Sequence, residues 1–292
     1  MERRETTIND LCQVAPSVLD GLPARCVGEW AYDKIYMLVR YLEIFANGMK
    51  SKWQGNLNYI EICSGPGRCI RRDSGEELDG TALAIVRSPA FQHIKRAIFL
   101  DNNRVVIETL NRRLTALHAD GKCSALVGDY TDGEGLCRTI GEFGLSGLNL
   151  LFLDPTDCSV PFSTVASISR QMGKVDLIIN VAIGTDVTRN IKRALTTTDS
   201  GVRSKYAAFL GSEGFFLTTK NVELARNDAD QDLRLAFVEE YRKALQGIGL
   251  VHFDAKKIRH YYYLVFASAA GLGLDFWRKI NLVAPDEQRL FF

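Results

Sequence analysis

The chain has 292 residues, of which 46% are apolar, and its formal net charge is +1. This length suits one α/β domain with insertions, and the apolar content is sufficient for a large core. The near balance of 36 basic and 35 acidic side chains gives no electrostatic basis for bulk binding to nucleic acid or to an anionic membrane.

The N-terminal residues 1–28 are weakly patterned and form an arm in which we expect a short helix near 8–20. Apolar residues at helical spacing then predict a helix over 29–49. Beyond it, apolar runs alternate with amphipathic segments, which is typical of β-α-β units. The predicted strands are 57–63, 97–101, 123–129, 148–155 and 175–181. The first of the predicted helices begins near 81, and the others cover 105–118, 133–144 and 163–172. The polar segment 68–79 is expected to be a loop.

The C-terminal third departs from this alternation. We expect short helices and loops over 183–230, then a helix over 230–246 and a final helix near 274–280. A tight turn separates two further strands, 250–258 and 261–269, and therefore predicts an antiparallel hairpin. The predicted organisation is an arm (1–28), a nucleotide-binding Rossmann-like core (29–182), a helical insert over the site (183–230) and a C-terminal part of the same domain (231–292).

Five parallel strands followed by an antiparallel hairpin predict an α/β fold with a mostly parallel, seven-stranded sheet covered on both faces. Dinucleotide-binding dehydrogenase folds normally continue with parallel strands, whereas methyltransferases insert the last strand in the opposite direction. By this fold-level analogy we expect the methyltransferase type of Rossmann-like fold.

The cysteines favour an intracellular protein. The seven are odd in number and show no CxxC spacing, which indicates reduced thiols rather than a disulfide or zinc framework. The first residues lack the apolar segment of a signal peptide, and no apolar run is long enough to cross a bilayer. We therefore expect a cytoplasmic protein that has no metal site and does not bind a membrane.

The segment EICSGPG at 61–67 lies where an open α/β sheet binds its ligand, beyond the end of the first predicted strand. Glycines let a backbone approach a ligand closely, and turn N–H groups can receive a carboxylate. Glu61 is placed to accept a hydrogen bond from a ligand ammonium, Asp101 to hold ribose hydroxyls, and Asp129 to accept from an adenine amino group. This order predicts S-adenosylmethionine as cofactor. The candidate cofactor residues are Glu61, Cys63, Ser64, Gly65, Gly67, Arg68, Asp101, Asn102, Asp129 and Tyr130.

Two alternatives compete with this interpretation. The Gly-Pro-Gly turn is also compatible with a purely structural tight turn, and each strand-ending Asp with a helix cap. An NAD site would need a glycine at position 70, where this chain has Ile70, and a helix that starts directly after the turn. Asp101 also follows Gly67 by more than the usual spacing of about 20 residues. The chain has no Walker A sequence, so ATP hydrolysis has no support.

A second candidate loop follows the fourth predicted strand. Asp154-Pro155-Thr156-Asp157 lies where amino-methyltransferases carry an Asp/Asn-Pro-Pro-aromatic motif that holds a planar amine. Asp154 can accept a hydrogen bond or a proton from a nucleophile there. Thr156 and Asp157 depart from that motif, and the nearest aromatic is Phe162. A helix-capping turn is the structural alternative.

Several motifs together resemble one family, the three-Cys-motif partner proteins (TcmP), over about residues 33–280. They are Lys34 with 41–42, YIEICSGPGR at 59–68, GTALA at 80–84, FLDP at 152–155, VPFSTV at 160–165, LIIN at 177–180, and YYLVFAS at 262–268 with 273–277. The resemblance implies a methyltransferase-like Rossmann fold and a three-Cys-motif protein, similar to radical S-adenosylmethionine enzymes, as partner. The chain departs from the family at Glu61, at Cys63-Ser64 and at Thr156-Asp157.

These observations lead to two main hypotheses. In the first, the chain is an S-adenosylmethionine-dependent methyltransferase for a nucleobase or another planar amine. Asp154 and Pro155 face the acceptor, and Lys34 and Arg68 assist from the rim. In the second, it is an inactive binding module that keeps the fold and holds a protein or a nucleic acid. An NAD-linked enzyme is the third and weakest.

Overall fold

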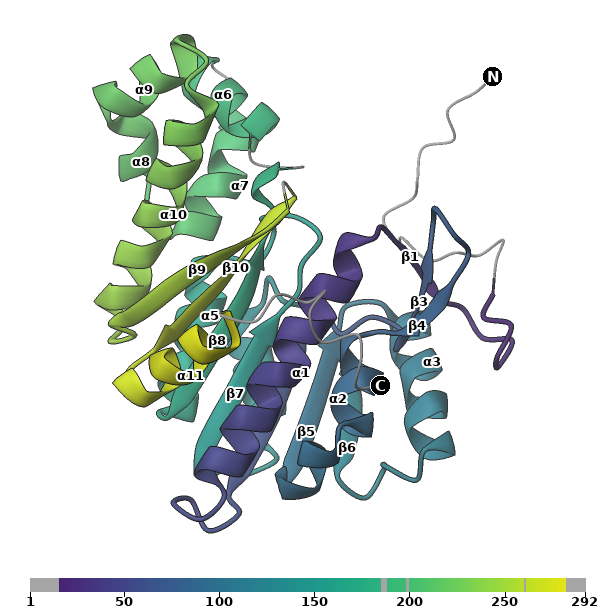
Figure 1. The fold of residues 1–292 in the computed structure, drawn as a ribbon. Helices are drawn as coiled ribbons and strands as arrows, with labels where there is room; N and C mark the ends of the chain where they lie inside the picture. The colour runs from purple at the N-terminus through teal and green to yellow at the C-terminus, as the bar shows by residue number, and fades with distance from the viewer. Residues whose placement is uncertain (1–15, 185–187, 198–199, 260, 282–292) are drawn as a thin grey trace.

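A computed structural model describes residues 16–184, 188–197, 200–259 and 261–281 (Figure 1). Seven strands form one sheet in the order β6-β5-β2-β7-β8-β10-β9. Their bounds are β2 Leu57–Ile62, β5 Arg96–Asp101, β6 Cys123–Val127, β7 Leu148–Leu153, β8 Val175–Val181, β9 His252–Ile258 and β10 Tyr262–Ser268. The first five strands in this order, β6, β5, β2, β7 and β8, are parallel. β10 runs antiparallel to both β8 and β9. The predicted fold class is confirmed.

Helices cover both faces of this sheet. One face carries α1 Trp30–Met49, α2 Thr81–Arg87, the short helix η1 Pro89–His93, α3 Arg104–Ala116 and α11 Gly271–Asn281, and their apolar side chains form one core. The other face carries α4 Gly133–Gly141, α5 Phe162–Met172 and α10 Asp230–Gly247 over a second core. Every residue of β2, β7 and β8 is buried, as expected for parallel strands that are covered twice.

The segment expected to be irregular is mostly helical in its described residues. It holds α6 Thr188–Thr196, α7 Ser200–Leu210, α8 Gly214–Leu217 and α9 Thr219–Arg226, which gather beside α10 (Figure 1). Lys205 of α7 pairs at 2.9 Å with Asp157, in the loop after β7. No helix in the described part of the chain combines the length and apolar character that a bilayer span requires.

The polar segment 68–79 was predicted to be a loop, but it forms two strands of a separate small sheet. β3 Arg68–Arg71 pairs antiparallel with β4 Glu77–Asp79 and parallel with β1 Arg25–Val27 from the arm. Only Cys69 of these strands is buried, so the apolar alternation that marks a strand is missing. The expected helix near 8–20 lies largely outside the described residues, and 16–20 is not helical.

The cysteines follow the expectation only in part. Free thiols are present at Cys63, Cys69, Cys123, Cys137 and Cys158. Cys26 is disulfide-bonded, so reduced thiols were wrongly expected there.

The chain reverses its direction of sheet growth at β2, which lies between β5 and β7. In open α/β sheets the crevice for a ligand opens at such a reversal, beyond the carboxyl ends of the strands. Ile62 and Leu153 are register partners there, and the Asp154 N–H donates to Ile62 O at 3.0 Å. The loops after β2 and β7 therefore leave the sheet side by side.

Candidate functional site

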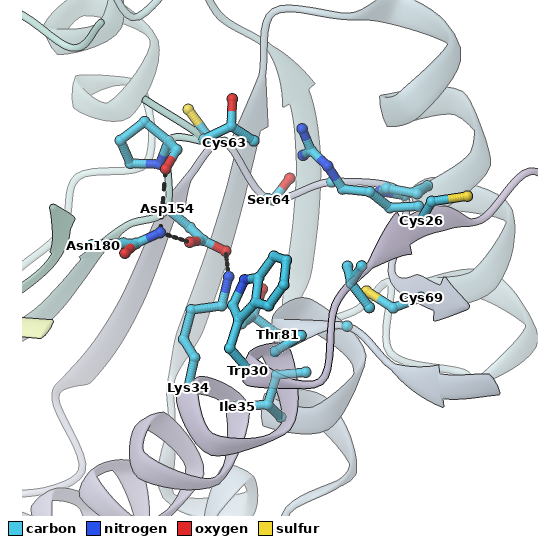
Figure 2. Close-up of a pocket in the computed structure, with 18 of the residues that line it drawn as sticks. Cys26, Trp30, Lys34, Ile35, Cys63, Ser64, Cys69, Thr81, Asp154 and Asn180 are labelled. Carbon is cyan, nitrogen blue, oxygen red and sulfur yellow. Dashed lines mark hydrogen bonds and ion pairs between the residues drawn. The ribbon is translucent and has the colours of Figure 1, made fainter. Parts of the chain in front are cut away.

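Two adjoining cavities open at this reversal. The main cavity has a volume of about 370 Å³ and is walled by β1, α1, the glycine turn, β3, the loop after β7 and the start of β10 (Figure 2). The side cavity, of about 70 Å³, lies against the ends of β5 and β7. Arg25, Cys63, Pro66 and 154–156 line both. The main cavity falls within the size range of ligand pockets, whereas the side cavity holds about two water molecules.

The glycine turn forms the boundary between the cavities. Gly65 and Gly67 have φ of +66° and +91°, and a Cβ on Gly67 would lie 3.0 Å from Leu83 and Leu110. Cys63 adopts φ of +65°, a conformation that favours glycine. The turn therefore requires both glycines, and it imposes strain at the cysteine.

Two backbone donors of this turn, at Ser64 and Gly65, are used within the protein. The Ser64 N–H donates to Leu100 O at 3.0 Å, and the Gly65 N–H donates to Asp101 Oδ2 at 3.1 Å. Pro66 has no N–H. The expectation that these groups receive a ligand carboxylate is thus wrong for Ser64 and Gly65. The Ser64 hydroxyl, in contrast, is buried in the main cavity wall without a hydrogen-bond partner among the described residues.

Glu61 lies beneath the cavities rather than in them. Its carboxyl group is fully buried on β2 and accepts hydrogen bonds from the Tyr59 hydroxyl at 2.8 Å and from the Thr81 hydroxyl. Burial raises the pKa of Glu61 to about 8. Thr81 lines the main cavity, whereas Glu61 does not. The Thr81 hydroxyl therefore links the cavity to the Glu61 carboxyl group through its hydrogen bond.

The other two predicted carboxylates lie in different hollows. Asp101 is buried at the end of β5 and lines the side cavity with Asn102 and Tyr130. Its two oxygens accept from the Gly65 and Asn103 N–H groups at 3.1 and 3.0 Å. Asp129 is exposed, accepts from the N–H and hydroxyl of Thr131, and lines a separate hollow beside α4. The structure therefore places Asp101 at the glycine turn but leaves Asp129 outside both cavities.

The loop after β7 contributes a connected polar group to the main cavity (Figure 2). Lys34 Nζ of α1 lies 2.5 Å from Asp154 Oδ2, and the Asn180 amide of β8 donates to Asp154 Oδ1 at 3.0 Å. Asn180 also donates to Pro155 O at 3.2 Å. Both members of the ion pair are more than four-fifths buried, so the pair is fixed and faces the cavity. The structure thus brings the predicted Lys34, Asp154 and Pro155 together.

Other parts of the main cavity wall are basic and aromatic. Arg68 lies 3.4 Å from Asp20 and 3.5 Å from Asp79, so it is held in the wall by two carboxylates. Trp30 packs on Tyr261 with ring centroids 4.1 Å apart, and both line the main cavity. Flat aromatic faces beside a cavity of this kind suit a planar ligand.

Sequence reasoning missed several residues of this site. The buried guanidinium of Arg113 donates to Pro66 O at 2.7 Å and to Pro23 O at 2.9 Å. It also binds both oxygens of Asp20 at 2.8 and 2.9 Å, which ties the arm to the glycine turn. Arg25, Trp30 and Thr81 also line the main cavity. Asn180 also belongs to the site, and it carried a usable signal, because it is a polar residue near the end of the apolar run of β8.

No family model matches the sequence, and no curated protein matches it either. Solved structures similar to the chain include EvdMO1, at 13% identity and a TM-score of 0.39, over 80% of this chain and 41% of that protein. ChlM, a magnesium protoporphyrin IX methyltransferase from Synechocystis PCC 6803 with bound SAM, matches at 11% identity and a TM-score of 0.40. The match covers 82% of this chain and 80% of ChlM. NcsB1, an O-methyltransferase from neocarzinostatin biosynthesis, matches at 11% identity and a TM-score of 0.37. The match covers 78% of this chain and 56% of NcsB1.

The chain thus spans less than two thirds of EvdMO1 and of NcsB1. Because these TM-scores are below 0.5, the assignment of the methyltransferase type of fold depends on the strand order and the antiparallel hairpin of the sheet itself.

Proposed function

We propose that this protein is an S-adenosylmethionine-dependent methyltransferase that acts on a nucleobase or another planar amine. The observation that carries the proposal is the junction of the two cavities at the glycine turn, on a sheet with the methyltransferase strand order. One elongated ligand at that junction would contact Ser64 in the main cavity and Asp101 in the side cavity. A carboxylate has about four acceptor sites, so Asp101 retains capacity for ribose hydroxyls beside its two backbone donors.

The chain's own residues fit this cofactor at several points. The unpartnered Ser64 hydroxyl offers a hydrogen bond, and both turn glycines keep side chains away from the ligand. Asn102 and Tyr130 wall the side cavity, where the adenosyl part would lie. The side cavity must widen for that part to enter, since its volume is about 70 Å³. Rotation of side chains on binding is a common way to do so.

The acceptor would lie in the main cavity. The bound cofactor supplies the methyl group on a sulfonium, and the acceptor nitrogen supplies the electron pair. Asp154 would accept a hydrogen bond from the amine and take the proton that the alkylated nitrogen releases. Lys34 already occupies Asp154 Oδ2, so an amine there would compete with Lys34 and weaken the ion pair. Trp30 and Tyr261 would hold the planar ring, which supplies catalysis mainly by positioning.

A second candidate function is a binding module without catalysis. Both oxygens of Asp154 already have a partner, Lys34 and Asn180, and Asp157 is paired with Lys205. Both contacts favour a structural role for the loop after β7. The resemblance to three-Cys-motif partner proteins supports pairing with a three-Cys-motif protein, and a nucleic acid is the other candidate partner.

Calorimetry with S-adenosylmethionine, S-adenosylhomocysteine and NAD tests the cofactor. We expect micromolar binding of the first two only, and a loss of at least tenfold on Asp101→Ala. Asp120→Asn, at an exposed turn, is the control and should bind like the wild type. Heat with NAD alone would refute the proposal.

A tritium-methyl transfer assay on DNA, tRNA and cell lysate then separates the two candidate functions. Label in one fraction that disappears in Asp154→Asn supports the methyltransferase. Cofactor binding without label in any fraction supports the binding module. Co-purification from the source cells then tests the three-Cys-motif partner.

A further inference from the structure

The arm is a fixed part of the cavity wall. β1 pairs in register with β3, so that Arg25 lies opposite Cys69. Arg113 joins the residues before β1 to the glycine turn, because one guanidinium nitrogen donates to both Pro23 O and Pro66 O. Its other nitrogens hold both carboxylate oxygens of Asp20. Arg25, at the start of β1, is therefore held at a defined position relative to the turn.

That position is directly over the glycine turn. A Cβ placed on Gly65 would lie 3.9 Å from Nη1 of Arg25. Arg25 also lines both cavities, so its side chain stands where they join. An elongated ligand that extends from the side cavity into the main cavity must pass this guanidinium.

The chemistry of the turn leaves a role for a side-chain cation. A carboxylate at a glycine turn is usually bound by successive backbone N–H groups. Here those of Ser64 and Gly65 already donate to Leu100 O and Asp101, and Pro66 has none. The N–H groups of Ser64 and Gly65 are therefore not available to an anion at this turn, which leaves a place for side-chain donors. The buried Ser64 hydroxyl, without a partner among the described residues, is one donor there, and the Arg25 guanidinium is the nearby cation.

We propose that Arg25, together with the Ser64 hydroxyl, binds the carboxylate of the amino-acid end of the cofactor. This inference rests on the proposed function and adds a cofactor contact on the arm. Arg25 is then the residue that selects ligands with an amino-acid tail over nucleosides without one.

Calorimetry with two ligands that differ in this tail tests the proposal. S-adenosylhomocysteine carries the carboxylate, whereas 5′-methylthioadenosine lacks it and keeps the adenosyl group. Loss of a charge-assisted hydrogen bond should weaken binding about 10- to 100-fold. We expect Arg25→Gln to show this loss for S-adenosylhomocysteine and to change the affinity for 5′-methylthioadenosine less than twofold.

Arg71→Gln is the matched control. It removes the same charge from the same small sheet, but Arg71 pairs with Asp73 and Glu76 at 2.7 and 2.9 Å and lines neither cavity. We expect both affinities to stay at the wild-type values. Ser64→Ala should weaken S-adenosylhomocysteine alone, and it decides the question if thermal melting shows that Arg25→Gln does not fold.

Three outcomes overturn the proposal, and they are distinguishable. Unchanged affinity of Arg25→Gln for S-adenosylhomocysteine shows that Arg25 does not bind the tail. Equal losses for both ligands show that Arg25 only supports the wall. A wild-type protein that binds neither ligand refutes the cofactor site itself and, with it, the proposed function.

Discussion

Replacing Arg113 by methionine should remove the anchor between the arm and the glycine turn. The Arg113 side chain is 3% exposed and binds Asp20, Leu22, Pro23 and Pro66 through five hydrogen bonds. Methionine fills a similar volume but donates nothing. The substitution therefore leaves the carbonyl groups of Pro23 and Pro66 and the Asp20 carboxylate without their main donor, whereas Leu22 O keeps the Ser17 N–H.

The size of the effect follows from burial. Removing one partner of a fully buried ion pair costs about 3–5 kcal/mol. Asp20 is 27% exposed, so water partly compensates it and the lower end, about 3 kcal/mol, applies. For a chain of this size, 1 kcal/mol lowers the melting temperature by about 2 °C. We therefore expect Arg113→Met to melt about 6 °C below the wild type at pH 7.

The pH dependence gives this prediction a second readout. The hydrogen bond from Arg113 holds the pKa of Asp20 well below its usual range. The stability that Asp20 contributes is therefore present above its unfolded pKa of about 3.8 and is lost as the pH falls towards the folded value. We expect the difference in melting temperature between wild type and Arg113→Met to shrink at pH 3. Circular dichroism follows the melt at both pH values.

Limited trypsin digestion checks the location of the effect. Cleavage after Arg25 should become faster in Arg113→Met, because the arm loses its anchor. Arg138→Met is the control, since Arg138 is 71% exposed and its Asp132 partner is 3.9 Å away. A melting temperature of Arg113→Met within 2 °C of the wild type, with unchanged cleavage, would refute the assigned role.

Three further predictions concern groups near the cavities. Because the folded pKa of Glu61 is about 8 and the unfolded value is 4.5, wild-type unfolding free energy should fall as pH rises between them, by up to about 1.4 kcal/mol per unit. Glu61→Gln should lack this component in urea titrations across that range, and identical slopes would contradict it. Gly67→Ala should cost about 1–3 kcal/mol more than Gly21→Ala, because a Cβ meets two leucines at 3.0 Å at Gly67 and nothing within 4 Å at Gly21. Equal melting temperatures would count against the close packing at Gly67. In a double-mutant cycle by chemical denaturation, Lys34→Met and Asp154→Asn should show a coupling of about 1–3 kcal/mol, and simple additivity would mean that the ion pair is not formed in solution.

The sheet could be predicted from sequence because its central strands are continuous apolar runs bounded by turns. β2, β7 and β8 are buried on both faces, and this leaves a signal that needs no tertiary information. The antiparallel hairpin could be predicted because a tight turn separates the apolar run of β10 from the more polar β9. The small sheet could not, because β3 and β4 are polar and β1 joins them from the distant arm.

From residue patterns alone, without the family resemblance that named Lys34, the site was predictable only where position along a strand determines contact. Asp101 and Asp129 gave the same signal, an acid after an apolar run. Asp101 is still part of β5 and lies at the turn, whereas Asp129 falls two residues after β6 ends at Val127, where Thr131 takes its carboxylate. Arg113 follows another arginine on an amphipathic helix, so the sequence alone could not separate a buried anchor from a solvated face.

The docked arm also sets an order of assembly during synthesis. Arg25 leaves the ribosome before its strand partner β3 and well before Arg113, which holds the arm on the turn. At about 5–20 residues per second, several seconds pass between translation of the arm and that of its anchor. During that interval the nascent chain cannot close the main cavity. The arm thus reaches its final place only after α3 has emerged, and a nascent chain released before then lacks the anchor of that part of the cavity wall.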